Sequence, residues 1–253
     1  MIPKIIHYIW VGGKPLTPLV EKCLESFKKF CPDYTIKRWD ETNFDIQSNK
    51  FCADAYDKKK WAFVSDVIRL YALVNEGGIY LDTDVELLKS LDNFLAHEAF
   101  SGFEHDGIYL QTGVLGAIKG FSLFKELLLE YNEREFILPN GSLNVVPNIH
   151  YLTNLCFKKG LVQNNKLQSI EGLTIYPNMY FCPKHFEQQD YEISEETVSI
   201  HHFAASWLDK KTRQKHKANE LLIKYKERYG NKYKILFIMR HPFRALSILK
   251  SKK

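Results

Sequence analysis

The sequence predicts an α/β domain built on a largely parallel sheet. Three observations support this prediction: strand-like apolar runs alternate with helical patterns, 45% of the 253 residues are apolar, and no repeat or low-complexity segment interrupts the alternation. A chain of this length buries about 70–75% of its unfolded surface, so one sizeable core is expected. The composition excludes a collagen, a coiled coil and a disordered tail, and the apolar runs are shorter than the ~18 residues of a membrane span.

The pattern begins with a strand at residues 5–11, which are β-branched and aromatic. Thr17 and Pro18 provide a helix cap and a first-turn proline, and Pro32 ends this helix. A second strand is expected at residues 35–39. The order strand, helix, strand is typical of an α/β domain.

The clearest helix covers residues 58–76, because apolar side chains recur on one face and two glycines follow as a stop. Its expected buried stripe consists of Phe63, Val67, Leu70, Tyr71 and Val74. A short apolar strand follows at residues 79–81. The later expected elements are strands at 99–103, 114–118, 173–176 and 197–202, and a helix at 121–132 before a looser region to about residue 170.

Two aspartates, Asp82 and Asp84, come directly after the strand at residues 79–81. In an extended segment, side chains at i and i+2 project from the same side. Ligands of open α/β sheets gather beyond the carboxyl ends of the strands. A carboxylate pair there suits Mg²⁺ or Mn²⁺, which neutralises the charge on a departing diphosphate. The same pattern also occurs on solvated turns, so its meaning depends on its context.

That context includes Asp66 and Arg69, which lie three residues apart on the helix at 58–76. Both sit on one shoulder of its apolar stripe, where the helix meets the sheet. One interpretation is a structural ion pair. The other is a carboxylate and a guanidinium that bind sugar hydroxyls.

Four ordered motifs resemble glycosyltransferase family 32, the sugar-binding region that contains an Asp-x-Asp motif. They lie at residues 5–13, 61–70, 77–84 and 201–207. The resemblance implies a GT-A-like, Rossmann-type fold, a nucleotide-sugar donor and transfer with retention at the anomeric carbon. It does not extend beyond residue 210, and Val146-Pro147 stands where many members carry a Gly-Pro pair.

The resemblance also implies which residues bind the donor. Trp10 would stack on the nucleotide base, whereas Ser206 and Trp207 would contact the diphosphate under a closing lid. Each tryptophan could instead be a core aromatic, and Tyr80 could pack rather than line the sugar pocket. The complete donor-binding set is Trp10, Asp66, Arg69, Tyr80, Asp82, Ser206 and Trp207.

For the metal, the resemblance makes Asp84 the principal carboxylate and Asp82 a second contact, direct or through water. His201 or His202 would add a further ligand, and only one of them is expected to point at the site because consecutive strand residues face opposite ways. His201 is favoured slightly because Ser199-Ile200 leads directly into it. Gln111 would contact the reacting face of the sugar. Together with Asp66 and Arg69, the residues Asp82, Asp84 and Gln111 form the expected catalytic set, and Mn²⁺ or Mg²⁺ is the expected cofactor.

The expected reaction moves a hexosyl group from a nucleoside diphosphate sugar, most simply a UDP-hexose, to a glycan or lipid-linked acceptor in bacterial surface polysaccharide synthesis. No matched residue stands out as a covalent nucleophile, which favours front-face displacement. One alternative is an inactive nucleotide-sugar-binding protein. A phosphatase of the haloacid dehalogenase type is disfavoured by Glu86, where Thr or Val is usual. For a glycoside hydrolase, Asp82 and Asp84 stand too close.

Charge divides the chain into an acidic part and a basic tail. Residues 210–253 carry 15 Lys or Arg and two acidic residues, a net charge of +13, which leaves −8 on residues 1–209. We expect residues 1–209 to be the catalytic domain and residues 210–253 a basic helical appendage. The appendage either lies on anionic lipid or packs on the domain, and no nucleic-acid motif accompanies it.

The five scattered cysteines contain no Cys-x-x-Cys pair, so ordinary buried thiols are expected rather than disulfides or a thiolate zinc site. The first residues lack the pattern of a signal peptide. A cytoplasmic location, peripheral to the inner face of the plasma membrane, is therefore the expectation.

Overall fold

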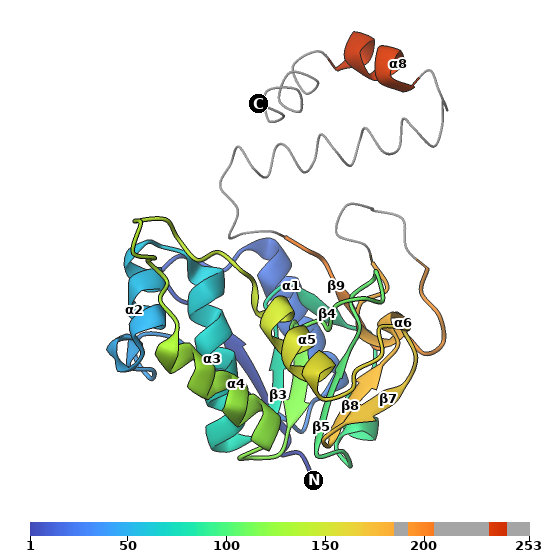
Figure 1. Ribbon diagram of the computed structural model, residues 1–253. Helices are drawn as coiled ribbons and strands as arrows, with labels where there is room; N and C mark the ends of the chain where they lie inside the picture. The colour runs from blue at the N-terminus through green and yellow to red at the C-terminus, as the bar shows by residue number, and fades with distance from the viewer. Residues whose placement is uncertain (185–191, 205–232, 242–253) are drawn as a thin grey trace. The chain divides into compact units, whose positions relative to one another are not determined.

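The computed structural model describes residues 1–184, 192–204 and 233–241. The chain divides into two compact units, formed by residues 1–184 with 192–202 and by residues 185–191 with 203–253. In the second unit the described helix is α8, Tyr233–Arg240 (Figure 1). The expected boundary between residues 209 and 210 and most of the expected basic appendage lie outside the described residues.

Within the described residues, seven strands form the central sheet in the order β2-β1-β3-β6-β5-β8-β7 (Figure 1). Their bounds are β1 Ile5–Ile9, β2 Thr35–Trp39, β3 Gly78–Leu81, β5 Ala99–Gly102, β6 Val114–Ala117, β7 Gln168–Ile170 and β8 Leu173–Tyr176. Strands β2, β1, β3, β5 and β8 run in one direction, whereas β6 and β7 run in the other. The predicted α/β class with a largely parallel sheet is confirmed.

A smaller sheet pairs β4, Val85–Leu87, with β9, Ser199–His201. The two strands are antiparallel, and Val85 lies opposite His201. Because β4 follows β3 after the three residues Asp82-Thr83-Asp84, this pairing brings a distant part of the chain to the turn after β3.

Helices cover both faces of the central sheet. Neighbouring residues of β3 point to opposite faces, and Tyr80 belongs to one hydrophobic cluster while Ile79 and Leu81 belong to the other. The first cluster includes α2 to α5, among which α3 and α4 pack together, and the second includes α1 (Figure 1). The bounds are α1 Pro18–Phe30, α2 Lys50–Asp57, α3 Trp61–Glu76, α4 Ser122–Glu133, α5 Asn148–Lys158 and α6 Asn178–Phe181, with 3₁₀ turns at Ile46–Ser48 and Asp92–Phe94.

The sequence patterns predict most strands of the central sheet and α1, α3 and α4, but not α2, α5, α6, β4 or β7. The expected stripe of α3 is wrong at Tyr71, which is 38% exposed and contacts Trp39 and Phe44 edge-on. Val64 and Ile68, outside that stripe, are also buried, and α2 and α4 pack against α3 in addition to the strands of the sheet. A helix covered on two sides needs more than one apolar face.

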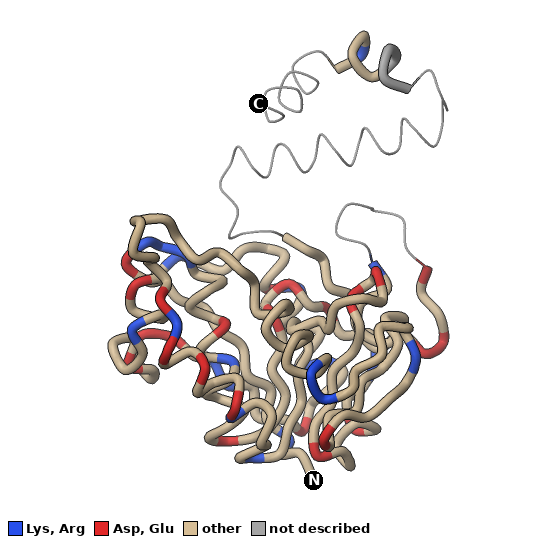
Figure 2. The backbone as a smooth tube through the Cα atoms, viewed as in Figure 1, with Lys and Arg blue, Asp and Glu red and all other residues tan. Residues whose placement is uncertain are grey.

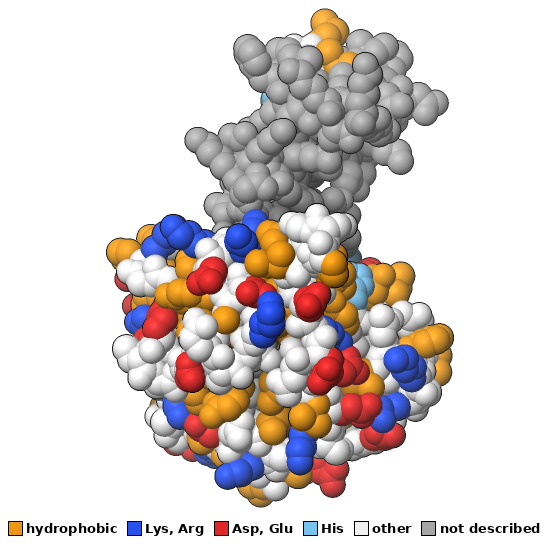
Figure 3. Space-filling model, turned by 60° about the vertical axis from the view of Figure 1, so that its left-hand side comes forward, with side chains coloured by type: hydrophobic (Ala, Val, Ile, Leu, Met, Phe, Trp, Pro, Cys, Tyr) orange, Lys and Arg blue, Asp and Glu red, His pale blue; other side chains and the backbone are white. Residues whose placement is uncertain are grey.

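All five cysteines are buried and free of disulfides, as predicted. Acidic and basic residues are spread over the described surface (Figure 2), and apolar side chains lie among them on the face seen in Figure 3. Among the helices that the structure describes, none has the length and apolar character needed to cross a membrane.

Candidate active site

The two aspartates of the Asp-x-Asp motif are held by the turn that follows β3. The backbone N–H of Asp82 donates to the carbonyl of Gly113 at 2.8 Å, and that of Val85 donates to the carbonyl of Asp82 at 3.0 Å. The carbonyl of Asp84 accepts a hydrogen bond from the N–H of His202 at 2.9 Å. The backbone therefore fixes both carboxylates relative to β6 and β9.

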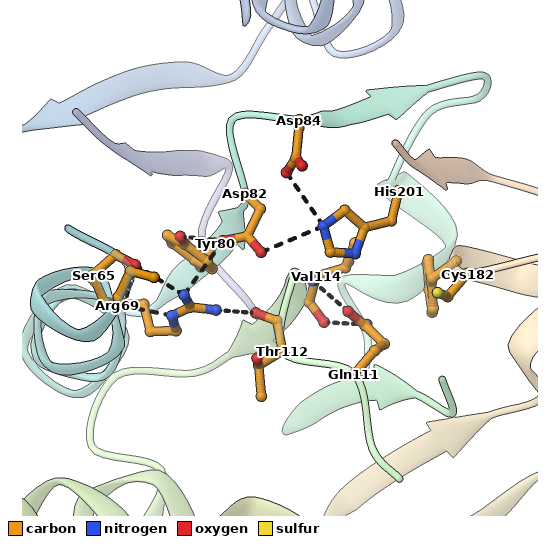
Figure 4. A network of polar contacts seen from close by, with 12 residues as sticks. Ser65, Arg69, Tyr80, Asp82, Asp84, Gln111, Thr112, Val114, Cys182 and His201 are labelled. Carbon is orange, nitrogen blue, oxygen red and sulfur yellow. Dashed lines mark hydrogen bonds and ion pairs between the residues drawn. The ribbon is translucent and has the colours of Figure 1, made fainter. Parts of the chain in front are cut away.

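Asp82, Asp84 and His201 converge on one point (Figure 4). The His201 Nε2 atom lies 3.2 Å from Asp84 Oδ1 and 3.8 Å from Asp82 Oδ2. One ligand atom from each of the three residues lies within 4.8 Å of the others. Two carboxylates and an imidazole are ligands that Mn²⁺ accepts, so this donor set fits a divalent cation.

His202 lies outside this group, although the sequence also offers it as a metal ligand. Its Nε2 atom is 2.7 Å from Glu86 Oε2, and Lys22 Nζ donates to the same oxygen at 2.7 Å. Because adjacent residues of an extended segment point to opposite sides, only one of the two histidines faces the aspartates.

The electrostatic surroundings of His201 favour its protonated form while no cation is bound. Burial alone would lower the pKa of His201, but the carboxylates of Asp84, Asp82 and Glu104 outweigh burial and raise this pKa to about 9. A cation that uses the imidazole therefore has to displace a proton.

Asp66 and Arg69 form the ion pair that the helix spacing suggests, with Arg69 Nη2 at 3.1 Å from Asp66 Oδ1. Both side chains are buried, at 6% and 4% exposure. Burial raises the pKa of Asp66 to about 6, although Arg69 and the backbone N–H of Asn148 act in the opposite direction.

The guanidinium of Arg69 joins this pair to the Asp-x-Asp motif. Its Nη2 atom lies 3.4 Å from Asp82 Oδ1, and its Cζ atom lies 4.6 Å from the centre of the Tyr80 ring. It also donates to the Thr112 carbonyl at 2.7 Å and to Ser65 Oγ at 3.0 Å (Figure 4). The sequence does not predict these two contacts of Arg69. Thr112 accepts through its backbone carbonyl, which any residue could offer, and no spacing pattern marks Ser65.

Tyr80 and Gln111 position the site from within the core. Tyr80 is 2% exposed and donates its hydroxyl to Asp82 Oδ1 at 2.5 Å. The buried Gln111 amide donates to the Val114 carbonyl at 2.6 Å and accepts from the Val114 N–H at 2.7 Å. These bonds hold the Gln111 side chain against the start of β6, and the sugar contact that the family resemblance implies for it stays a prediction.

Gly113 allows the close approach of the cluster to β6. A Cβ atom at this position would lie 3.1 Å from Asp82 Oδ2 and 3.4 Å from the imidazole of His201. Any larger residue would therefore displace at least one of the three convergent side chains.

Trp10 lies just after β1, half-buried, and its indole N–H donates to the Lys14 carbonyl at 2.6 Å. Ser206 and Trp207, the expected diphosphate contacts, lie outside the described residues. The structure therefore brings together Asp66, Arg69, Tyr80, Asp82, Asp84 and His201 from α3, β3, the turn after it and β9.

Two solved glycosyltransferase structures are similar in backbone to this chain. The PaToxG glycosyltransferase gives a TM-score of 0.49 with 19% identity, over 63% of this chain and 69% of that one. A glycosyltransferase involved in the glycosylation of the major capsid of PBCV-1 gives a TM-score of 0.45 with 14% identity, over 81% of this chain and 95% of that one.

In sequence, residues 17–101 match the family described as glycosyltransferase sugar-binding region containing DXD motif. The mannosyl phosphorylinositol ceramide synthase SUR1 of Saccharomyces cerevisiae is 26% identical over 154 residues, which are 55% of this chain and 37% of that protein. The uncharacterized glycosyltransferase L373 of Acanthamoeba polyphaga mimivirus is 31% identical over 196 residues, which are 72% of this chain and 74% of the relative. With that identity and coverage, the chain belongs to the family of glycosyltransferases whose sugar-binding region contains a DXD motif, here Asp82-Thr83-Asp84.

Proposed function

We propose that this glycosyltransferase is metal-dependent and retaining, and that it moves a hexosyl group from a UDP-hexose to a glycan or lipid-linked saccharide in bacterial surface polysaccharide synthesis. One observation carries the proposal: Asp82, Asp84 and His201 converge at the end of β3, with ligand atoms within 4.8 Å of one another. The side chains of Asp82, Asp84 and His201 are 22%, 16% and 14% exposed, so a donor can reach them.

The residues around this point would hold a cation and orient the donor. A divalent cation bound by Asp82, Asp84 and His201 supplies positive charge against the departing nucleoside diphosphate. Tyr80 and Arg69 fix one oxygen of Asp82 in advance, so little reorganisation is needed during the reaction. Asp66 and Arg69 orient the sugar.

In the proposed reaction the acceptor hydroxyl attacks the anomeric carbon from the side of the leaving group. The bond from that carbon to the diphosphate oxygen breaks while the bond to the acceptor oxygen forms. The leaving diphosphate takes the acceptor proton, which requires no base from the chain. Pre-organised donor and acceptor supply much of the rate enhancement.

A panel of donors tests this proposal. The purified chain is incubated with Mn²⁺ and UDP-glucose, UDP-galactose, UDP-N-acetylglucosamine or GDP-mannose, and free nucleoside diphosphate is measured. We expect release from a UDP-hexose and an unchanged anomeric configuration in the product, read by NMR. Absence of release with every donor would favour an inactive binding protein. A trapped covalent sugar–enzyme adduct would contradict front-face displacement.

Cation binding is expected to release about one proton near pH 7 and to tighten about tenfold per pH unit until His201 deprotonates. The pKa of His201 is raised to about 9, and its Nε2 atom has to be free to bind the cation. Calorimetric titration with Mn²⁺ in two buffers of different ionisation enthalpy measures the released protons. The His201→Asn variant is the control and should release none; equal enthalpies in both buffers for the unmodified chain would refute the prediction.

We also propose that residues 210–253 hold the enzyme at an anionic membrane surface, where a lipid-linked acceptor is presented. Their 15 Lys or Arg support this proposal. On α8, Ile238 and Met239 are 49% and 75% exposed, which suits an interfacial helix. Deletion of residues 230–253 should abolish sedimentation with phosphatidylglycerol vesicles, with phosphatidylcholine vesicles as the control. Unchanged sedimentation of the shortened chain would end this proposal.

A further inference from the structure

A second group of potential metal ligands adjoins the Asp-x-Asp cluster. It consists of Glu104, Cys182 and His201, whose ligand atoms all lie within 4.8 Å of one another. The Cys182 thiol donates to Glu104 Oε2 at 3.4 Å. Figure 4 shows Cys182 on the side of His201 away from Arg69. Neither Glu104 nor Cys182 takes part in the proposed transfer.

We propose that Glu104, Cys182 and His201 form a second cation site, which takes a thiophilic divalent ion such as Zn²⁺ and shares His201 with the Asp-x-Asp cluster. A thiolate, an imidazole and a carboxylate are the three kinds of ligand that zinc takes in proteins. By contrast, the oxygen-rich Asp82 and Asp84 pair suits Mn²⁺ or Mg²⁺. The two sites would therefore bind different metals.

The distance between the two non-shared ligands fits zinc. With Zn–S at about 2.3 Å and Zn–O at about 2.0 Å, a tetrahedral angle separates sulfur and oxygen by about 3.5 Å. The observed Sγ to Oε2 distance is 3.4 Å. Neither side chain has to move far to bind the ion. Three protein ligands leave a fourth position for water or for a substrate group.

Hydrogen bonds fix the backbone that carries each ligand. The N–H of Glu104 donates to the Tyr109 carbonyl at 2.7 Å, and the N–H of Cys182 donates to the Asn178 carbonyl at 2.8 Å. Two residues before His201, Ser199 Oγ donates to the Phe181 carbonyl at 3.1 Å, which ties β9 to the segment that carries Cys182. Ligands held in this way lose little conformational entropy when the ion binds.

The carboxylate of Glu104 is a further reason to expect a cation. It lies beside the Cys182 thiol and the His201 imidazole, with ligand atoms within 4.8 Å of one another. Within the described residues, no lysine or arginine forms an ion pair with Glu104. A divalent ion would compensate the charge of this carboxylate and displace the proton of the thiol.

Cobalt provides a probe that does not depend on enzyme activity. The full chain, stripped with a chelator, is titrated with Co²⁺, and the thiolate-to-cobalt charge-transfer absorption is recorded. We expect one Co²⁺ per chain to produce this absorption and Zn²⁺ to displace it. Cys182→Ser should abolish the absorption, whereas Cys156→Ser, which changes an equally buried thiol, should retain it. Glu104→Gln should weaken Co²⁺ binding by about 100-fold. Removal of a side chain that only hydrogen-bonds to a metal ligand already costs up to about 100-fold, and Glu104 would bind the metal directly.

A further variant separates this proposal from the proposed function. Asp84→Asn should retain the charge-transfer absorption, because Asp84 is not among the three ligands, even though it should lose Mn²⁺-supported transfer. Absence of the absorption from the unmodified chain at stoichiometric Co²⁺, or its persistence in Cys182→Ser, would overturn the second site. If Cys182→Ser does not fold, as judged by its thermal unfolding, the near-isosteric Glu104→Gln variant decides the question through its affinity for Co²⁺.

Discussion

Asp84→Asn is expected to lower kcat/KM for Mn²⁺-supported transfer by about 10³-fold, which corresponds to about 4 kcal/mol of transition-state stabilisation. The reason is electrostatic. Asp84 Oδ1 lies 3.2 Å from His201 Nε2, and its carboxylate supplies one of the two negative charges of the cation cluster. The amide keeps the shape of the side chain but not its charge. Release of free nucleoside diphosphate measures the loss of transfer, and calorimetry measures the accompanying loss of affinity for Mn²⁺.

Asp54→Asn is the matched control for this variant. Asp54 is also an aspartate in an ion pair, with Lys50 Nζ at 2.6 Å, but it lies on α2, outside the cluster. It should keep normal transfer and normal Mn²⁺ binding. A transfer rate for Asp84→Asn within a factor of about three of the unmodified chain would remove Asp84 from the proposed cation site.

Local sequence patterns predict those helices and strands that are determined by residues close together in the chain. The helix at Trp61–Glu76 has a clear apolar periodicity and a glycine stop, and the α/β class follows from the alternation of strands and helices along the chain. The GT-A-like fold is what the resemblance to glycosyltransferase family 32 implies. The three-residue strand Val85–Leu87 has no such signal. Its existence depends on pairing with β9, more than a hundred residues later, so only the tertiary structure reveals it.

The same distinction applies to the candidate site. Asp82 and Asp84 are marked by their spacing and by the apolar strand before them, and strand alternation limits the choice between the two histidines. The acceptors that hold the Arg69 guanidinium, the Thr112 carbonyl and Ser65 Oγ, could not be predicted. Every residue has a backbone carbonyl, and a single serine forms no recognisable motif. Glu104 and Cys182 are likewise far apart in the chain, and only the packing of α6 beside β5 and β9 brings them together.

Arg69→Ala is expected to destabilise the fold by about 3–5 kcal/mol, the cost of leaving a buried charge without its partner. Arg69 pairs with the buried Asp66 at 3.1 Å and lies 3.4 Å from Asp82. Urea unfolding at about pH 7.5 measures the loss. Arg69→Lys should lose less stability than Arg69→Ala because lysine keeps the positive charge. It should still lose some, because lysine lacks the planar, forked set of donors of the guanidinium. Removal of the orphaned carboxylate in the double variant Asp66→Asn with Arg69→Ala should recover part of the loss.

Arg38→Ala is the control, since Arg38 pairs with Asp40 at 2.8 Å but is 41% exposed. An exposed pair contributes at most about 1 kcal/mol, so the contrast with Arg69→Ala isolates the effect of burial. A loss no larger than that of Arg38→Ala would show that Arg69 does not compensate a buried charge.

The pH dependence of the Arg69→Ala loss distinguishes a charge effect from a packing effect. The pKa of Asp66 is already raised to about 6 by burial, and removal of Arg69 takes away the guanidinium that lowers it. A carboxyl whose pKa is higher in the folded than in the unfolded chain destabilises the fold progressively as the pH rises above its unfolded pKa. The difference in unfolding free energy between the unmodified chain and Arg69→Ala should therefore be smaller at about pH 5 than at about pH 7.5. A cavity left by the arginine side chain would produce the same loss at both values, because apolar packing does not titrate.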